Sequence, residues 1–250
     1  MERQPLISLE NVSFSFGREP VLDRISLEIG EGEYLGVIGP NGGGKTTLLR
    51  LMLGLIQPEG GTVSLFGQPV NAFRDWSKIG YIPQKATHIE SRFPYTVEEV
   101  VLLGRISRVG MLRRFKAADK KSIAEALELV DMLPYRKHLV TELSGGQQQR
   151  VFIAKGLVSD PAVLILDEPT VGVDLKSQDE FYRLLSRLNK EHSMTLVVVS
   201  HDVDVIANEV SSLACVNQTL IYHGEPKEFI KGDYLENLYG QGRKFILHGH

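Results

Sequence analysis

The sequence lacks the features that mark several classes of protein. It has a single cysteine, Cys215, so no disulfide can form within the chain. The apolar runs LLRLMLGLI and AVLIL are far shorter than the ~20 residues that a membrane-spanning helix needs. The opening residues, MERQPLISLE, carry charges and no long apolar stretch, which argues against a signal peptide. If the chain acts at a membrane, we therefore expect it to dock onto another protein there.

The chain also lacks an excess of positive charge. Its formal net charge is −3, which argues against a dedicated nucleic-acid binder. What it does have is the composition of an ordinary folded protein, with 42% apolar and 24% charged residues. A length of 250 residues suffices for one large α/β domain, or for a large domain with a small satellite. The apolar neighbours of Cys215 predict a thiol buried in a strand.

Short β-branched runs alternate with longer helix-like segments along the chain. The runs VLIL and LVVV are apolar throughout, which is typical of strands buried on both faces of a parallel sheet. VSFSF alternates apolar and polar residues, as a half-exposed antiparallel sheet does. Strands are predicted at residues 7–16, 26–29, 34–38, 62–65, 79–82, 163–166, 195–199, 213–216 and 220–223. Helices are predicted after Lys45, over 97–103 and about 117–130, and after Ser144, Leu175 and Asp202, with capping-box spacing at Thr96–Glu99 and Ser144–Gln147.

Residues 39–47, GPNGGGKTT, fit the phosphate-binding P-loop pattern, with a strand-like YLGVIG before them and a helix-like TLLRLMLG after them. Glycines let the backbone turn tightly, so that N–H groups and the positive end of the new helix face one anion. We expect Lys45 to reach the β- and γ-phosphates of ATP and the Thr46 hydroxyl to bind Mg²⁺. The alternative is a glycine-rich turn that merely precedes a lysine. The predicted ATP-binding residues here are Gly39, Pro40, Asn41, Gly42, Gly43, Gly44, Lys45, Thr46 and Thr47.

A pair of acids follows a predicted apolar strand in the segment VLILDE. Enzymes with a P-loop place a carboxylate near the metal in this way, so we expect Asp167 to hold Mg²⁺ through water. Glu168, one residue further on, is a candidate general base for the attacking water. The alternative is an ordinary polar strand end; a P-loop upstream favours the functional interpretation.

The segment LSGGQQQR at residues 143–150 indicates which class of P-loop protein this chain resembles. Ser144 is placed to cap a helix whose first turn is opened by Gly145 and Gly146, and such a helix start can also bind a phosphate. Lying between a P-loop and an acidic strand end, LSGGQ resembles the signature of the ABC ATPase family, and the resemblance covers essentially the whole chain. It implies that two copies pair head to tail, with Ser144, Gly145, Gly146 and Gln147 of one copy binding the ATP held by the other.

Other positions match this family one by one. Gln84 in YIPQ resembles the Q-loop glutamine, which senses Mg²⁺ and the γ-phosphate, and Asp174 in PTVGVD resembles the D-loop residue at the dimer seam. His201 in VVVSHD resembles the switch histidine that contacts the γ-phosphate; without the family pattern it would be interpreted as a structural residue. Phe16 stands where the family often has a tyrosine that stacks on adenine, and a ring face suffices for that role. A place in the core is the alternative for Phe16.

The resemblance implies an α/β fold, with a P-loop NTPase core of mainly parallel sheet, an antiparallel β subdomain and a helical subdomain. The core would take residues 1–83 and 141–225, the helical subdomain 84–140, and a C-terminal helical tail 226–250. Because the chain has one P-loop and one signature, a working ATPase needs two copies. The implied partners are a second copy, integral-membrane permease subunits and a substrate-binding protein, and the implied location is the cytoplasmic face of the membrane. ATP-driven closure of the dimer would move the permease helices, and loss of the γ-phosphate on hydrolysis would let the dimer open.

Two longer segments, which include TVEEVVLLGR and ACVNQTLIYHG, resemble the zinc and manganese importers of the family. Importers of iron chelates and cobalamin share the first of these, so the sequence leaves them open as well. It also leaves open an ABC ATPase without a transport role. A nucleotide kinase is disfavoured, because a kinase would not need LSGGQ.

Two charged segments have no assigned role. Between residues 105 and 121 lie seven basic residues and one acid, Asp119, a pattern typical of a solvated face and, as an alternative, of a permease contact. His248 and His250 near the end of the chain could bind a metal weakly, although a solvated tail is the preferred interpretation. The basic residues are Arg105, Arg108, Arg113, Arg114, Lys116, Lys120 and Lys121.

Overall fold

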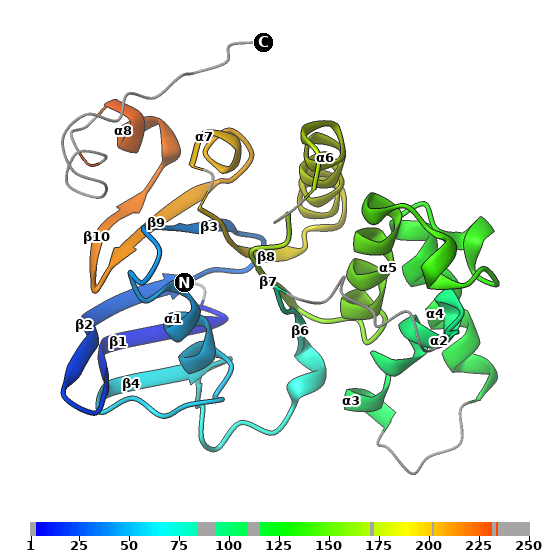
Figure 1. The fold of residues 1–250 in the computed structure, drawn as a ribbon. Helices are drawn as coiled ribbons and strands as arrows, with labels where there is room; N and C mark the ends of the chain where they lie inside the picture. The colour runs from blue at the N-terminus through cyan, green and yellow to red at the C-terminus, as the bar shows by residue number, and fades with distance from the viewer. Residues whose placement is uncertain are drawn as a thin grey trace. The chain divides into compact units, whose positions relative to one another are not determined.

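Figure 1 shows the computed structural model of the chain, which describes residues 4–84, 94–109, 116–170, 173–201, 203–231 and Tyr234. The chain forms two compact units, Met1–Arg74 with Ser193–His250, and Asp75–His192. Each unit has its own strands, helices and buried side chains. Within the described ranges, no helix combines the length and the apolar character needed to cross a membrane.

The first unit contains an antiparallel sheet with strand order β2-β1-β4-β5. β1 (Ile7–Phe16) lies between β2 (Glu19–Ile29) and β4 (Gly60–Leu65), and the short β5 (Gln68–Pro69) pairs with β4. Buried apolar side chains from β1, such as Leu9, give way to exposed or half-exposed ones toward its end. The antiparallel arrangement predicted for the first strands is confirmed.

The same unit contains the strands that carry the P-loop. β3 (Tyr34–Ile38) lies between β8 (Thr195–Val199) and β9 (Ser212–Asn217) and is parallel to both, while β10 (Thr219–Gly224) returns antiparallel to β9. Every residue of β3 and β8 is buried, which explains why their sequences are apolar throughout. Cys215 of β9 is fully buried, as predicted, and burial raises the pKa of its thiol. Among the described residues of this unit, the helices are α1 (Lys45–Met52), α7 (Val203–Ile206) and α8 (Pro226–Lys231).

Within its described residues, the second unit joins two parallel strands to five helices. β6 (Ile79–Ile82) pairs in parallel with β7 (Val163–Asp167). The helices are α2 (Val97–Leu103), α3 (Ile106–Val109), α4 (Ala117–Leu129), α5 (Gly145–Leu157) and α6 (Leu175–His192), and three short 3₁₀ turns lie at Trp76–Lys78, Leu133–Tyr135 and Val140–Glu142. α5 is central because it packs against α2, α4, α6 and β6. The limits proposed for the helical subdomain, 84 and 140, both fall inside this unit, and the subdomain division stays a prediction.

The interpretation of residues 105–121 as a solvated basic face is wrong for two of its members. Arg105 and Asp119 are buried, with 10% and 7% of their side chains exposed, and Arg105 Nη2 lies 2.9 Å from Asp119 Oδ1. The other oxygen of Asp119 accepts a hydrogen bond from the Lys116 backbone N–H at the start of α4, at 2.7 Å. A capping role and an ion pair thus turn Asp119 inward. Arg113, Arg114, His248 and His250 lie outside the described residues.

Asp119→Ala should lower the free energy of unfolding by about 3–5 kcal/mol, because the Arg105 guanidinium would remain buried without its carboxylate. Urea denaturation followed by circular dichroism measures this change. Glu125→Ala is the control: it breaks the exposed pair of Glu125 with Lys121 on the same helix and should cost about 0–1 kcal/mol. Equal losses in the two variants would contradict the structural role of the buried pair.

Candidate functional site

The loop between β3 and α1 takes a conformation that only glycine permits. Gly42 and Gly44 have φ angles of 80° and 97°, in the region that L side chains rarely adopt. Gly39 lies so close to β9 that a Cβ placed on it would be 2.0 Å from the Val216 carbonyl oxygen. The loop therefore passes close along the end of β9, where only a residue without a side chain fits.

Lys45 opens α1 and folds back over this loop. Its side chain is 5% exposed, and its Nζ donates to the carbonyl oxygens of Gly39 (2.8 Å) and Pro40 (3.0 Å). Gly44, at the N-cap of α1, has no side chain with which to cap the first turn, and the positive end of a helix favours an anion. Thr46 is exposed and Thr47 is buried. The loop geometry and the buried amine fit a bound polyphosphate.

Two more predicted residues lie in this first unit. Phe16, the last residue of β1, is 54% exposed and presents its ring edge-on to Phe14, with the ring centroids 5.0 Å apart. An exposed aromatic ring leaves apolar surface in water, which suits a stacking role better than a place in the core. His201 is exposed and follows β8 by two residues.

The predicted acids and Gln84 come together in the second unit. Because β6 and β7 are parallel neighbours, their carboxyl ends meet at one edge, and Gln84 follows β6 as Glu168 follows β7. Gln84 Nε2 donates to Glu168 Oε2 at 2.7 Å. Asp167, the last residue of β7, is buried. The Asp167 carboxylate, and separately the exposed Thr46 hydroxyl of the first unit, are oxygen donors of the kind that Mg²⁺ prefers, so the chemistry of each fits the metal.

Glu168 also has an unusual backbone. Its φ angle is 45°, in the left-handed region, and Pro169 follows it. A proline further narrows the conformations open to the residue before it. Such a conformation costs about 1–3 kcal/mol and persists only when its surroundings hold it in place.

The signature segment forms the start of α5. Ser144 Oγ accepts from the Gln147 backbone N–H (3.3 Å), and the Ser144 N–H donates to Gln147 Oε1 (2.9 Å), which confirms the predicted capping box. Gly145 is exposed, and a Cβ there would meet nothing within 4 Å. A cavity of about 280 Å³ lies beside this helix start, between α5 and α6, and Gly146 lines it. The first turn of α5 is therefore accessible to a ligand.

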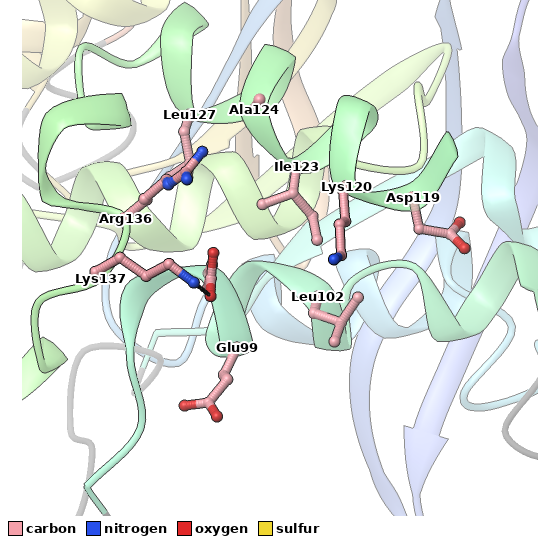
Figure 2. A pocket seen from close by; sticks show the side chains of 10 residues that line it. Glu99, Leu102, Asp119, Lys120, Ile123, Ala124, Leu127, Arg136 and Lys137 are labelled. Carbon is pink, nitrogen blue, oxygen red and sulfur yellow. Dashed lines mark hydrogen bonds and ion pairs between the residues drawn. The ribbon is translucent and has the colours of Figure 1, made fainter. Parts of the chain in front are cut away.

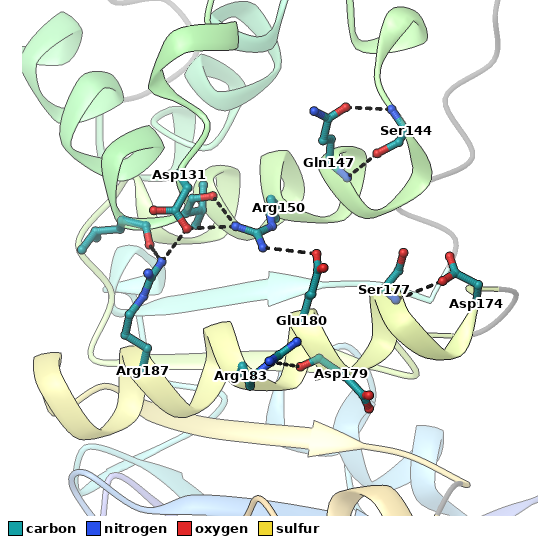
Figure 3. A network of polar contacts seen from close by, with 12 residues as sticks. Asp131, Ser144, Gln147, Arg150, Asp174, Ser177, Asp179, Glu180, Arg183 and Arg187 are labelled. Carbon is teal, nitrogen blue, oxygen red and sulfur yellow. Dashed lines mark hydrogen bonds and ion pairs between the residues drawn. The ribbon is translucent and has the colours of Figure 1, made fainter.

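Asp174 lies at the start of α6, near the signature segment in Figure 3. It is exposed, and its Oδ1 accepts from the Ser177 backbone N–H at 3.1 Å. Hydrogen bonds from Ser177 hold the pKa of the Asp174 carboxyl below its ordinary value. The preceding residues Val171 and Gly172 lie outside the described part of the chain.

A network of ion pairs between α5 and α6 was not predicted. Arg150 Nη1 and Arg187 Nη2 donate to the same oxygen of Asp131, at 2.9 and 2.8 Å, and Glu180 lies 3.9 Å from Arg150 (Figure 3). Asp131 has a φ of 60°, so it turns the chain sharply after α4. The charges come from three separate parts of the sequence, Asp131, Arg150 and α6, so no local pattern predicts that they meet.

A second cavity, of about 270 Å³, lies between α2 and α4 (Figure 2). Its floor is apolar, with Leu102, Ile123 and Leu127, and its rim is charged, with the ion pair of Glu98 and Lys137 at one end. None of the predicted site residues lines it, so it lies apart from the candidate site.

The first unit thus contains the P-loop, Phe16 and His201, and the second contains Gln84, the acids, the signature and Asp174. A family model described as ABC transporter matches residues 22–171. The chain belongs to the ABC transporter family. As a member of this family with an α/β fold, a P-loop and the LSGGQ signature, it is an ATPase.

Relatives of this ABC ATPase are similar over nearly their whole length. It is 43% identical to the zinc uptake system ATP-binding protein ZurA of Listeria monocytogenes, over 90% of this chain and 87% of ZurA. It is 36% identical to the manganese transport system ATP-binding protein MntB of Bacillus subtilis, over 96% of this chain and 94% of MntB. The chain also resembles a solved structure, the dimeric ATP-binding cassette MJ0796 bound to ADP and Pi, with a TM-score of 0.70 and 28% sequence identity. The match covers 88% of this chain and 98% of the MJ0796 chain.

Phe16→Ala in this ABC ATPase should raise the Kd for ATP by about 2- to 10-fold, the range that corresponds to loss of one aromatic stack. Because the side chain is 54% exposed, the melting temperature should stay within a few degrees of the wild type. Isothermal calorimetry with ATP measures the affinity, and Phe16→Tyr, which keeps a ring face, is the matched control. An unchanged Kd in Phe16→Ala would rule out stacking at this position.

Proposed function

We propose that this ATPase drives the uptake of zinc or manganese through a separate membrane permease. The observation that carries the proposal is the similarity to ZurA and MntB, which spans nine-tenths or more of this chain. The higher identity, 43% against 36%, makes zinc the first ion to test. The ion would cross the permease and need not touch this subunit, so no ligand set for it is expected here.

Within one copy, the proposed hydrolytic site combines the two groups of residues described above. Lys45 binds the β- and γ-phosphates, and Thr46, Asp167 and Gln84 hold Mg²⁺, which when bound neutralises charge between those phosphates. Glu168 accepts a proton from the attacking water as general base. The 2.7 Å bond from the Gln84 amide orients that carboxylate, which supports this role. His201 contacts the γ-phosphate.

The proposed site is completed by a second copy. The open first turn of α5, with Ser144, Gly145, Gly146 and Gln147, binds the γ-phosphate held by the other copy, and Asp174 lies at the seam between the two. The dimeric state of MJ0796 with ADP and Pi supports this arrangement. Because groups on both sides bind the phosphate that leaves, the closed dimer binds ATP better than ADP, and hydrolysis opens it.

In this function the subunit is peripheral to the cytoplasmic face of the membrane, where it docks onto permease subunits. A substrate-binding protein delivers the ion on the other side. The names of ZurA and MntB as ATP-binding proteins of uptake and transport systems support a multi-subunit machine of this kind.

Glu168→Gln should reduce ATP hydrolysis to background and yet give a stable dimer with ATP, because the amide cannot accept the proton but leaves the phosphate contacts in place. Light scattering measures the mass, and phosphate release measures the rate. Lys45→Ala is the control and should form no dimer with ATP. A monomeric Glu168→Gln protein at saturating ATP would contradict the composite site.

Transport is tested by reconstituting the subunit with its co-encoded membrane protein in liposomes, with Glu168→Gln as the blank. ATP-dependent uptake of Zn²⁺ or Mn²⁺ alone is the expected result and would name the ion. Transport only of an iron chelate or cobalamin would leave the ATPase in place and overturn the metal-ion assignment. Hydrolysis without transport of any of these would favour a non-transport role.

A further inference from the structure

The three consecutive glutamines that follow the signature glycines have three different partners. Gln147 completes the capping box of α5. Gln148 Nε2 donates to two backbone carbonyl oxygens of the segment before the signature serine, at 3.1 and 3.2 Å. Gln149 Nε2 donates to the Pro169 carbonyl oxygen at 2.7 Å, so it reaches the segment directly after Glu168. The run is therefore three separate contacts rather than one polar stretch.

The Gln149 amide is held in a single orientation. Gln149 is 3% exposed, and the Pro169 carbonyl can only accept, so the donor nitrogen must face it. Its Oε1 is buried and has no hydrogen-bond partner among the described residues. An unpaired buried acceptor costs about 1–3 kcal/mol, which offsets the roughly 0.5–1.5 kcal/mol that the hydrogen bond to the Pro169 carbonyl contributes. Stability alone thus gives little reason for a glutamine at this position.

Only a few rotatable backbone bonds separate the Pro169 carbonyl, which Gln149 holds, from the strained backbone of Glu168. The ring of Pro169 fixes the φ angle of that residue, so its ψ angle is the only soft backbone torsion between the Glu168–Pro169 peptide bond and the Pro169 carbonyl. Holding that carbonyl therefore restrains the Glu168 backbone at its φ of 45°. A conformation of this kind needs such an outside restraint to persist.

The next carbonyls of the same segment are held from α6. Gln178 Nε2 donates to the carbonyl oxygens of Thr170 (3.3 Å) and Val173 (3.2 Å). Two side-chain amides, one from α5 and one from α6, thus hold the carbonyl oxygens of Pro169, Thr170 and Val173. The α5 amide is the one adjacent to Glu168.

We propose that Gln149 is a positioning residue for hydrolysis, which aims the Glu168 carboxylate by holding the Pro169 carbonyl. The proposal rests on the role of Glu168 as general base in the proposed function. It also gives α5 two tasks: its first turn binds the nucleotide of the other copy, and its second turn holds the base that acts on the nucleotide of its own copy. Each of the two sites in a dimer would then be mechanically tied to the other.

Gln149→Met tests this proposal because it keeps the shape of the side chain and removes the donor. We expect kcat for ATP hydrolysis to fall about 10- to 100-fold, the loss that a misplaced catalytic group produces, while KM for ATP stays within about twofold. The matched control is Gln148→Met, which removes the same amide one residue earlier and leaves the Pro169 contact in place; its loss of kcat should be smaller. An unchanged kcat in Gln149→Met would overturn the proposal.

Measuring the ATP-dependent dimer shows whether Gln149 positions Glu168 or only supports the fold of α5. In a Glu168→Gln background, adding Gln149→Met should leave the ATP-dependent dimer intact, because the signature turn is not disturbed. Loss of that dimer would mean that Gln149 serves the fold of α5, and would overturn the proposal. If Glu168→Gln alone still hydrolyses ATP, Glu168 is not the general base, and both the proposed function of Glu168 and this inference are wrong. If Glu168→Gln is inactive but Gln149→Met has the wild-type kcat, only the inference about Gln149 is wrong.

Gln149→Glu is the second variant, in case the methionine protein does not fold. Burial raises the pKa of a carboxyl, and only its protonated form can donate to the Pro169 carbonyl. We therefore expect its kcat, relative to wild type at the same pH, to rise as the pH is lowered from about 8 to about 6. A relative kcat that is flat or falls over this range would contradict the need for a donor.

Discussion

The close approach of the P-loop to the end of β9 is the constraint on which the first unit depends. Gly39 and Gly43 both pack against the Val216 carbonyl, and a Cβ on either would overlap it. Gln218, two residues further on, donates its N–H to the Gly43 carbonyl and accepts with its own carbonyl from Asp23 of β2. The loop is thus fixed by backbone alone to strands of both sheets. A phosphate cradle built in this way is rigid before any ligand arrives, and its N–H groups lose little entropy on binding.

Much of this arrangement can be predicted because the signals are local. A buried parallel strand is apolar along its whole length, so the sequence predicts β3, β7 and β8 nearly to the residue, and the motif residues follow directly at their ends. Capping boxes are equally local and are predicted correctly. α8 begins at Pro226, where the helical tail is predicted to start. The two-residue β5 is missed, and the predicted start of β2 comes several residues after Glu19.

Side chains whose partners lie far along the chain could not be predicted. Arg105 looks like part of a solvated basic run, yet its ion pair with Asp119 depends on how α4 packs, which no spacing encodes. Arg187 and Asp131 are separated by more than fifty residues and meet only because α4 ends where α6 passes. The triple glutamine is visible as a run, but its three roles depend on three different neighbours of α5. Sequence patterns identify which chemistry is present; tertiary packing decides which side chains hold it in place.

α5 shows why an ATPase of this kind carries polar side chains in a helix that could have been wholly apolar. Its buried face includes Val151 and Ile153, which secure it in the unit, while Gln147, Gln148 and Gln149 bond to the signature turn, the segment before it and the segment after Glu168. A helix is stiff along its axis, so a displacement at its first turn is passed to its second. Glu168, held in a strained conformation, is the kind of residue whose geometry responds sharply to such a small shift. If Glu168 is the base and the first turn of α5 binds the other copy's nucleotide, as proposed above, binding of that nucleotide would alter the geometry of Glu168 through α5.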